Sequence, residues 1–515
     1  MESERDGSWL LQYCWQPDVL ASCVLVTCLG ALSFGWKTIR WHRVRVSRSN
    51  PSRPTGGAEE DADVIVVGAG ILGNAMATSL ARDGRKVLLI ERDWSQPDRI
   101  VGELLQPGGF RALKRLGLQE SLDGSDCHRT HGYVVHNRES SQKVDLLYPS
   151  DDHTGETIEG RAFHHGRFVT GLRRLSKAEQ LVTPVHGSAL SLIREGDHVV
   201  GVACRLKDDS EVKEFRAPLT VVADGCFSNL RKTLVSARPQ NKSNFAGLVM
   251  HNCPQTRDHF AEVILASPAP VLVYQISSDS TRVLVDIPGQ KMPADAKTYL
   301  LETVAPQLPE LLHGPFVEAV STQAVRSMPN SFLPAAPVLQ PGALVLGDAF
   351  NMRHPLTGAG MTVALHDVEF WRDELKQLAD LHDVEAVLAI QRRFHWQRKM
   401  SHSFVANTLA QALYALFAAG DDDSMRSLRR ACFQYFLLGG DCAAGPISLL
   451  SILHPDPWTL IRHYIAVCLY GVYLDTMDFP MWKRPVLAPW IACKLIWASC
   501  RVMLPLAFSE LHFAK

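Results

Sequence analysis

The segment that most constrains the fold is residues 64–73, VIVVGAGILG, in which an apolar run leads into three glycines. The run is long enough for a buried parallel strand, and helical spacing follows the glycines. Gly68, Gly70 and Gly73 supply a tight turn, a close backbone approach to a pyrophosphate, and close helix–strand packing. The first amides of the helix would point at the phosphates. The segment therefore predicts a dinucleotide-binding βα unit.

The residues after this unit support the same prediction. Lys86–Ile90 is a second apolar strand, and Glu91 follows it, about twenty residues after the glycines. A carboxylate at that place can accept hydrogen bonds from both ribose hydroxyls. A glycine triplet alone is common in ordinary βα turns, but here strand, helix, second strand and acidic end stand in order. We therefore expect a bound dinucleotide.

Two later strand ends indicate which dinucleotide is bound. Residues 219–225 and 342–348 are apolar runs that end in an aspartate beside a glycine, and a further glycine loop, 358–360, precedes a helix expected to begin near Met361. An aspartate just past a strand end can hydrogen-bond a ribityl hydroxyl, and helix amides can face the electron-rich edge of a flavin. An NAD enzyme needs neither element, so we predict FAD as the cofactor.

The middle of the chain predicts a second sheet. Residues 271–276 and 282–287 have the pattern of antiparallel strands. We therefore expect an α/β protein, with a FAD-binding Rossmann-like domain of the glutathione-reductase type, an inserted antiparallel β-sheet substrate domain and C-terminal membrane-associated helices. The expected boundaries are 1–60 for an N-terminal membrane anchor and linker, 61–240 for the first part of the FAD-binding domain with part of the substrate lobe, 241–335 for the substrate-binding sheet, 336–375 for the last part of the FAD-binding domain, and 376–515 for the helical membrane-associated region.

Both ends of the chain carry membrane signals. Residues 19–36 are uncharged and largely apolar, and the basic residues after them would leave the next domain on the cytosolic side. The acidic start and the lack of a clear cleavage site argue against a cleaved signal peptide. Near the C-terminus, residues 446–453, 458–473 and 486–508 are apolar helices interrupted by basic residues, which suits a membrane interface. Helices that cover the flavoprotein core are the alternative.

The composition argues against several other classes. The 515 residues include 53 Lys and Arg against 54 Asp and Glu, a formal net charge of −1 that gives no basis for nucleic-acid binding. The 12 cysteines are scattered without the spacing of a zinc or redox motif, so we expect no metal site. A Ser–His–Asp set and a paired-carboxylate signature are also missing from the sequence, which agrees with flavin chemistry.

Several longer strings resemble one family. They are PDRIVGELLQPGG at 97–109, GRAFHHGRF at 160–168, SMPNSFLP at 327–334, residues 347–361, SHSF at 401–404 and AQALY at 410–414. Together with the glycine fingerprint, they resemble the squalene monooxygenase (squalene epoxidase) family, within the aromatic-hydroxylase-like superfamily of FAD monooxygenases. The resemblance extends over residues 61–515, while the preceding region resembles the family poorly.

The resemblance implies roles for particular residues. Tyr133, in the string HGYVV, matches a tyrosine important for activity, and a core tyrosine in a strand is the equal alternative. The guanidinium groups of Arg99 and Arg173 would satisfy pyrophosphate or flavin oxygens. The implied cofactor-binding residues are Gly68, Gly70, Ile71, Leu72, Gly73, Glu91, Arg92, Arg99, Leu104, Arg173, a position near Ala189, Asp348 and Met361.

Two positions depart from the family's pattern. The loop 358–360 is Gly-Ala-Gly where many relatives have three glycines, and an alanine prefers φ below zero. Phe350 stands where a tyrosine is common, which removes a hydroxyl. Neither change predicts the loss of the site.

The resemblance also implies a reaction. Squalene, O2 and NADPH-derived electrons would give (S)-2,3-epoxysqualene in sterol biosynthesis, through a FAD C4a-hydroperoxide held in an apolar tunnel that excludes water. The electrons would come from a separate NADPH–haemoprotein reductase at the endoplasmic reticulum membrane, with the catalytic domain facing the cytosol. A flavin reductase of polyprenyl lipids and a non-catalytic lipid-binding protein of the same fold are the alternatives.

Overall fold

The glycine triplet lies in the central βα unit of a large sheet. The computed structural model describes residues 60–100, 102–151, 155, 157–207 and 211–510, so the expected anchor at 19–36 lies outside the described residues. Strand β1 (Val64–Val67) is fully buried, and helix α3 (Ile71–Arg82) follows the glycine turn. Strand β2 (Val87–Glu91) pairs with β1 in parallel. The predicted β–α–β order is confirmed.

Seven strands form this first sheet, in the order β10-β9-β8-β2-β1-β11-β17. The strands other than β1 and β2 are β8 (Val182–Glu195), β9 (His198–Leu206), β10 (Val212–Arg216), β11 (Leu219–Val222) and β17 (Ala343–Val345). Strands β8, β2, β1, β11 and β17 pair in parallel, so their carboxyl ends meet at one edge. This is why polar residues that follow β2, β11 and β17 come together although they are distant in sequence.

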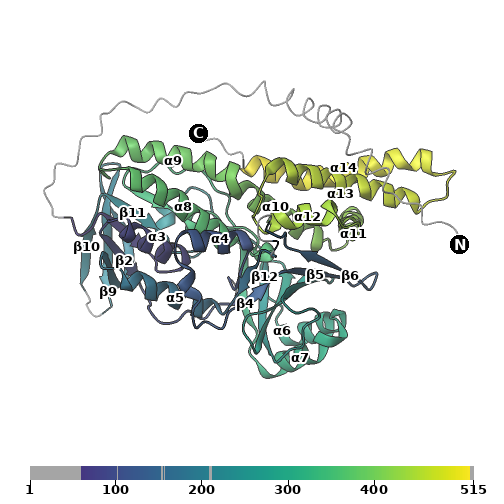
Figure 1. The fold of residues 1–515 in the computed structure, drawn as a ribbon. Coiled ribbons are helices and arrows are strands. Elements are labelled where there is room, and N and C mark those ends of the chain that lie inside the picture. The colour runs from purple at the N-terminus through teal and green to yellow at the C-terminus, as the bar shows by residue number, and fades with distance from the viewer. Residues whose placement is uncertain (1–59, 101, 152–154, 156, 208–210, 511–515) are drawn as a thin grey trace, which may run out of the picture. The chain divides into compact units, whose positions relative to one another are not determined.

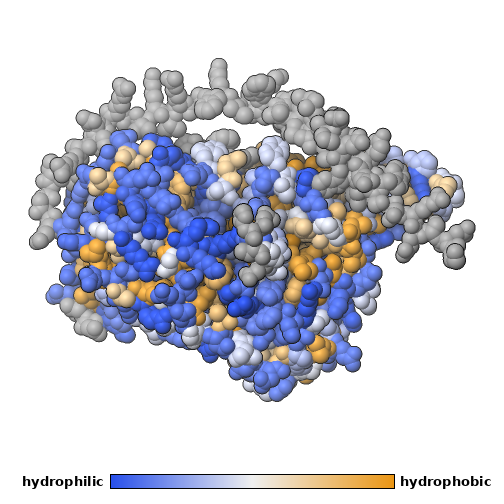
Figure 2. Space-filling view, viewed as in Figure 1, coloured by the Kyte–Doolittle hydropathy of each residue, from blue (hydrophilic) through white to orange (hydrophobic). Residues whose placement is uncertain are grey.

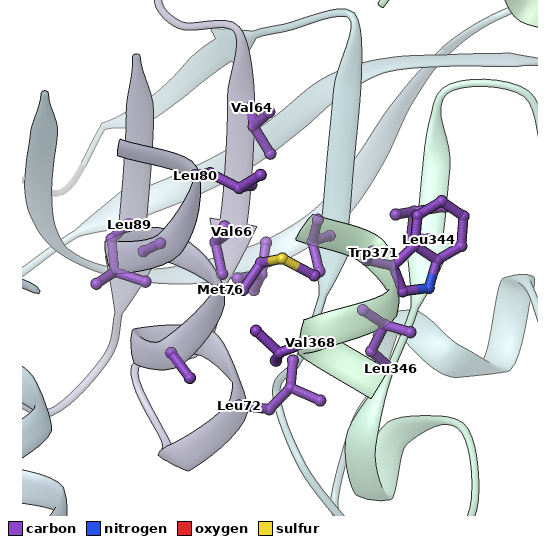
Figure 3. Close-up of a cluster of buried hydrophobic side chains, with 14 of the residues drawn as sticks. Val64, Val66, Leu72, Met76, Leu80, Leu89, Leu344, Leu346, Val368 and Trp371 are labelled. Carbon is purple, nitrogen blue, oxygen red and sulfur yellow. The ribbon is translucent and has the colours of Figure 1, made fainter. Parts of the chain in front are cut away.

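A dry hydrophobic core fixes the helices against this sheet. Helix α8 (Gly360–Gln377) begins one residue before the predicted start and contacts α3. Figure 3 shows side chains of the first sheet and of these two helices converging, and Trp371 of α8 is only 1% exposed. Each fully buried Leu, Val or Met stabilises the fold by about 1.5–3 kcal/mol. This packing holds the N-terminal ends of α3 and α8 at the same edge of the sheet.

The second sheet also has seven strands, in the order β16-β12-β15-β14-β13-β5-β6. Its strands are β5 (Gly132–Asn137), β6 (Gln142–Leu147), β12 (Gln240–His251), β13 (Phe260–Leu265), β14 (Val271–Gln275), β15 (Ser280–Pro288) and β16 (Arg326–Phe332). Its neighbouring strands are antiparallel except for the parallel pair β5–β13. The predicted second sheet is therefore confirmed as largely antiparallel, and it is called the substrate sheet after the role that we predict for it.

Short elements connect and cover the two sheets. Helices α6 (Ala296–Tyr299) and α7 (Glu310–Thr322) lie against the substrate sheet (Figure 1), where their apolar residues share a core with β12–β15. A three-stranded sheet joins the lobes, formed by β3 (Leu104–Leu105), β4 (His128–Thr130) and β7 (Gly160–Ala162). Helices α4 (Pro107–Arg115) and α5 (His165–Ala178) follow β3 and β7.

The C-terminal region is helical. It comprises α9 (Val384–Arg398), α10 (Phe404–Phe417), α11 (Asp423–Leu437), α12 (Asp441–Leu450), α13 (Pro457–Met477) and α14 (Arg484–Glu510). Helix α9 packs into the core of the first sheet through Val387, Ile390 and Phe394. Helices α13 and α14 lie side by side as a hairpin, drawn in yellow in Figure 1.

The hairpin presents an unusual amount of apolar surface. Met481, Trp482 and Val486 near its turn are each at least 75% exposed, and Figure 2 shows hydrophobic residues gathered over the C-terminal helices. Helix α14 is long and apolar enough to cross a membrane, although Lys494 and Arg501 interrupt it. Exposed tryptophans beside basic residues are typical of helices at a membrane interface.

Candidate active site

The carboxyl edge of the first sheet opens into a cavity of about 770 Å³ that the substrate sheet also lines. The predicted residues that line it are Gly68, Gly70, Ile71, Leu72, Glu91, Arg92, Arg99, Leu104, Tyr133, Arg173, Ala189, Asp348 and Met361. Gly73 does not line the cavity. The fold thus brings together positions that are far apart in the sequence. The cavity has a flavin-side wall, formed around the glycine turn and the carboxyl ends of the first sheet, and a substrate-side wall, formed mainly by the substrate sheet.

The flavin-side wall begins with the glycine turn. A Cβ on Gly73 would lie 1.8 Å from the Gly68 carbonyl oxygen, so Gly73 permits the close packing of α3 on β1. A Cβ on Gly70 would meet no atom within 4 Å, and Gly70 lines the cavity. No side chain caps α3, so its first amides are available to an anion beside Gly70. The turn fits the pyrophosphate of a dinucleotide.

Glu91 and Arg173 form the next part of this wall. Glu91 Oε2 accepts from Ala69 N at 2.7 Å, and Oε1 accepts from Asp93 N at 3.0 Å, which fixes the carboxylate at the cavity edge. Arg173 donates to the Ala69 and Ser95 carbonyl oxygens at 3.0 and 2.6 Å, and burial lowers its pKa. Both residues therefore brace the glycine turn as well as line the cavity.

Two carboxyl groups complete the flavin-side wall. Asp224 Oδ1 is buried with no hydrogen-bond partner among the described residues, and burial raises the pKa of this carboxyl. Asp348 lines the cavity and is exposed to that space. The protein around the cavity buries its carboxyl group away from bulk water, which raises its pKa. Burial lowers the pKa of the neighbouring Arg353 to about 10. An unpaired buried oxygen beside open space is what a cofactor hydroxyl would satisfy.

The two departures from the family pattern are both accommodated. Ala359 has φ −78°, whereas Gly358 has φ +62°, so the left-handed position of the loop is the glycine and the alanine is unstrained. Gly360 begins α8 without a side-chain cap and lines the cavity. Phe350 is buried against Phe394 and does not line the cavity, so its missing hydroxyl removes nothing from the site.

The substrate-side wall is mainly apolar. Its lining residues include Ala261, Leu272, Leu284, Met328 and Leu356. These side chains come from the substrate sheet and from the loop before α8. An apolar surface of this kind binds a hydrocarbon and disfavours water.

Tyr133 on this wall is held by a buried network. Gln106 Nε2 donates to Tyr133 Oη at 2.6 Å and to the Thr357 carbonyl oxygen at 2.7 Å, and Tyr148 Oη donates to Gln106 Oε1 at 2.8 Å. Burial raises the pKa of both tyrosines. The phenol of Tyr133 therefore stays neutral, and its own hydrogen remains available because the oxygen accepts from Gln106.

A buried ion pair lies beside this network. Arg282 of β15 donates to both oxygens of Glu103 at 2.6 and 2.9 Å, and Glu103 lines the cavity. The pair ties the string before β3 to the substrate sheet. Sequence analysis missed Gln106, Glu103 and Arg282, although the first two lie in the string PDRIVGELLQPGG, which is the signal that points to them.

Solved structures share this architecture. A p-nitrophenol 4-monooxygenase from Pseudomonas putida aligns with a TM-score of 0.63 at 15% identity, over 79% of this chain and 99% of that chain. A probable FAD-dependent monooxygenase from Pseudomonas aeruginosa aligns with a TM-score of 0.57 at 22% identity, over 70% and 97%. The fold of this chain is therefore shared with a FAD-dependent monooxygenase, and the polar part of its cavity fits a dinucleotide cofactor.

Comparison with known sequences identifies the family of this chain. The squalene epoxidase family model matches residues 216–488, and a model of NAD(P)-binding Rossmann-like domains matches residues 66–95. Squalene monooxygenase from Mus musculus is 49% identical over 453 residues, which cover 88% of this chain and 78% of that protein. Squalene epoxidase 3 from Arabidopsis thaliana is 44% identical, over 87% and 85%. The chain belongs to the squalene epoxidase family.

Proposed function

We propose that this chain epoxidises squalene in sterol biosynthesis. Squalene, O2, NADPH and a proton give (S)-2,3-epoxysqualene, water and NADP⁺. The observation that carries the proposal is one cavity whose first wall suits a polar dinucleotide and whose second wall suits a hydrocarbon. The names of the relatives, squalene monooxygenase and squalene epoxidase, support the same substrate.

The flavin-side wall would hold FAD through the residues that we predicted from the sequence. Gly68 and Gly70, with the first amides of α3, would take the pyrophosphate, and Glu91 the ribose. Asp348 would take a ribityl hydroxyl, and the start of α8 at Met361 would face the flavin. When bound and reduced, FAD supplies the activation of O2 that lets one oxygen atom pass to an alkene.

The remaining work falls to the substrate-side wall. Leu272, Leu284 and Met328 would hold the hydrocarbon chain and exclude water from the reacting double bond. An alkene has no acidic hydrogen and needs no protein nucleophile, so the wall has to position it rather than activate it. Tyr133 would orient the reacting centre through its hydroxyl, which Gln106 fixes in place.

Electrons and substrate would both arrive at a membrane. Squalene dissolves in bilayers, and the exposed tryptophans of the α13–α14 hairpin suit attachment of the hairpin to a membrane. We propose attachment to the endoplasmic reticulum membrane, with the catalytic domain on the cytosolic side and a separate NADPH–haemoprotein reductase as donor. The apolar length of α14 supports attachment to a membrane, while the choice of membrane and of electron donor follows from the resemblance to the family.

Product analysis tests the proposal. Detergent-solubilised protein is given squalene, FAD and NADPH, with and without purified reductase, under air and under nitrogen. We expect 2,3-epoxysqualene only when both oxygen and reductase are present. Flavin reduction without epoxide would reject the substrate, oxygen-independent reduction of a polyprenyl chain would favour the reductase alternative, and purified protein that binds no FAD would reject the enzyme.

A further inference from the structure

One cavity-lining segment, residues 353–360, is fastened by a side chain that does not itself line the cavity. Arg353 and Pro355 line the cavity, whereas His354 between them does not. His354 is 3% exposed, and its Nε2 lies 3.1 Å from Ser243 Oγ and 3.4 Å from Asp286 Oδ1. The cavity-lining segment 353–360 is therefore anchored in the substrate sheet.

The carboxyl group of Asp286, which faces His354, is held by side chains from two other strands of the substrate sheet. Asp286 of β15 accepts at Oδ1 from Ser243 Oγ of β12 at 2.7 Å and from Asn330 Nδ2 of β16 at 2.8 Å. All three side chains are at most 2% exposed. Asp286 Oδ2 has no hydrogen-bond partner among the described residues. A carboxylate this deeply buried depends on every donor that it has.

The tautomer of His354 follows from its other nitrogen. Leu356 N donates to His354 Nδ1 at 3.2 Å, so Nδ1 is unprotonated and Nε2 carries the hydrogen. Burial lowers the pKa of His354, so the ring is neutral at neutral pH. The imidazole therefore caps its own turn with one nitrogen and donates toward the substrate sheet with the other.

A third element holds the ring from above. The imidazole stacks on Tyr414 of α10, with 3.9 Å between ring centroids and 12° between planes. Phe245 of β12 packs edge-on against it, with centroids 5.7 Å apart. His354 thus lies where segment 353–360, the substrate sheet and the C-terminal helices meet.

We propose that His354 is a positioning residue that locks segment 353–360 to the substrate sheet and α10, and so sets FAD affinity and the alignment of the flavin with substrate. The second half of this inference rests on the proposed function. His354 is not a catalytic acid or base, because it does not line the cavity and both ring nitrogens are engaged. Groups behind a site that fix its geometry matter because small displacements are costly in rate.

The test titrates FAD into purified apoprotein of four variants and follows flavin fluorescence. His354→Ala removes every contact, His354→Gln keeps an amide donor, and Asp286→Asn removes the charge that the ring faces. His463→Ala is the matched control, a histidine that is 4% exposed in α13 and bonded to Tyr435 Oη at 2.9 Å. Melting temperature and near-UV circular dichroism are recorded for each.

We expect His354→Ala and Asp286→Asn to raise the FAD Kd by about tenfold or more. Partial recovery should appear in His354→Gln, and the Kd of His463→Ala should stay within about twofold of wild type at a comparable loss of melting temperature. If His354→Ala does not fold, Asp286→Asn and His354→Gln decide the matter. Unchanged FAD affinity in the folded members of this set would overturn the proposal.

Hydrogen peroxide release and epoxide formation together distinguish a failure of this proposal from a failure of the proposed function. With squalene and reductase present, the two damaging variants should release more hydrogen peroxide per NADPH oxidised than wild type, because the flavin is misaligned. Altered FAD affinity with no epoxide from the wild type would reject the squalene reaction and retain the anchoring role. Unaltered FAD affinity in the variants, with normal epoxidation by the wild type, would reject the anchoring role and retain the squalene reaction.

Discussion

The two walls of the cavity treat their polar groups in opposite ways. On the flavin-side wall, several polar groups are left open: α3 and α8 have no side-chain cap, Asp224 Oδ1 has no partner among the described residues, and Asp348 lines the cavity. On the substrate-side wall, polar groups are bonded to each other, as in the Glu103–Arg282 pair. Open groups suit a ligand rich in hydroxyls and phosphates, whereas closed networks leave an apolar face.

Because the walls differ in this way, one cavity can bind two unlike molecules. The flavin-side wall stores its binding capacity in backbone amides and carboxylates that a cofactor would satisfy. The substrate-side wall uses hydrogen bonds only to hold its own shape, so that binding there comes from apolar burial. A substitution confined to one wall should therefore leave the binding property of the other wall unchanged.

The largest expected effect comes from the glycine turn. Gly73→Ala places a Cβ 1.8 Å from the Gly68 carbonyl oxygen, so β1 and α3 must move apart. FAD affinity measured by flavin fluorescence should fall by about a hundredfold or more. Gly314→Ala in α7 is the control, since its Cβ meets no atom within 4 Å and should leave the affinity intact. An affinity within fivefold of wild type, about 1 kcal/mol, would contradict the packing account.

A smaller loss should follow from the carboxylate that braces this turn. Glu91→Ala removes the acceptor of Ala69 N at 2.7 Å and the expected ribose contact. Because hydrogen bonds to charged groups contribute about 1.5–3 kcal/mol, FAD affinity should fall about tenfold to a hundredfold. The exposed Glu318→Ala in α7 should change nothing. Equal affinities for both variants would contradict any contribution of Glu91 to FAD binding.

The substrate-side wall should respond in rate instead of cofactor affinity. Tyr133→Phe keeps the ring and deprives Gln106 of an acceptor at 2.6 Å, so kcat/KM for squalene should fall about threefold to tenfold while the FAD Kd is unchanged. Tyr148→Phe, which does not touch the cavity, should have a smaller effect. A change in FAD affinity as large as the change in kcat/KM would erase the distinction between the walls.

The smallest expected effect concerns pH. Burial lowers the pKa of His165, which lines the cavity, from 6.5 to about 4. Between these values the unfolded chain binds a proton that the folded chain does not, so stability is full above pH 6.5 and falls as the pH drops toward 4. Chemical denaturation at several pH values in this range gives the free energy of unfolding as a function of pH. This free energy should depend less steeply on pH in His165→Gln than in the wild type. Parallel curves for the variant and the wild type would refute the assignment.

Local patterns made the flavin-side wall predictable. Gly68, Gly70 and Glu91 belong to one βα unit, in which spacing along the chain fixes spacing in the fold. Asp348 was predictable because it closely follows the end of β17 at Val345, as Asp224 closely follows the end of β11 at Val222. Whether Ala359 would be strained could not be told from the sequence. The structure shows that it is not, because φ is negative at that position.

The substrate-side networks could not be predicted in the same way. Gln106 meets Tyr133, and His354 meets Asp286, through the pairing of strands and loops that are far apart in sequence. No periodicity marks such contacts, since each depends on strand register that only the folded sheet defines. The resemblance signalled Tyr133 as important, but the bonds that orient it became visible only in the structure.

Isotope labelling can follow the fate of oxygen in the cavity that both walls form. Purified protein loaded with FAD, supplied with reductase and NADPH, is incubated with squalene under ¹⁸O2, and the product is examined by mass spectrometry. The account predicts 2,3-epoxysqualene that carries one ¹⁸O atom. Unlabelled epoxide, or labelled hydrogen peroxide with no epoxide at all, would contradict it.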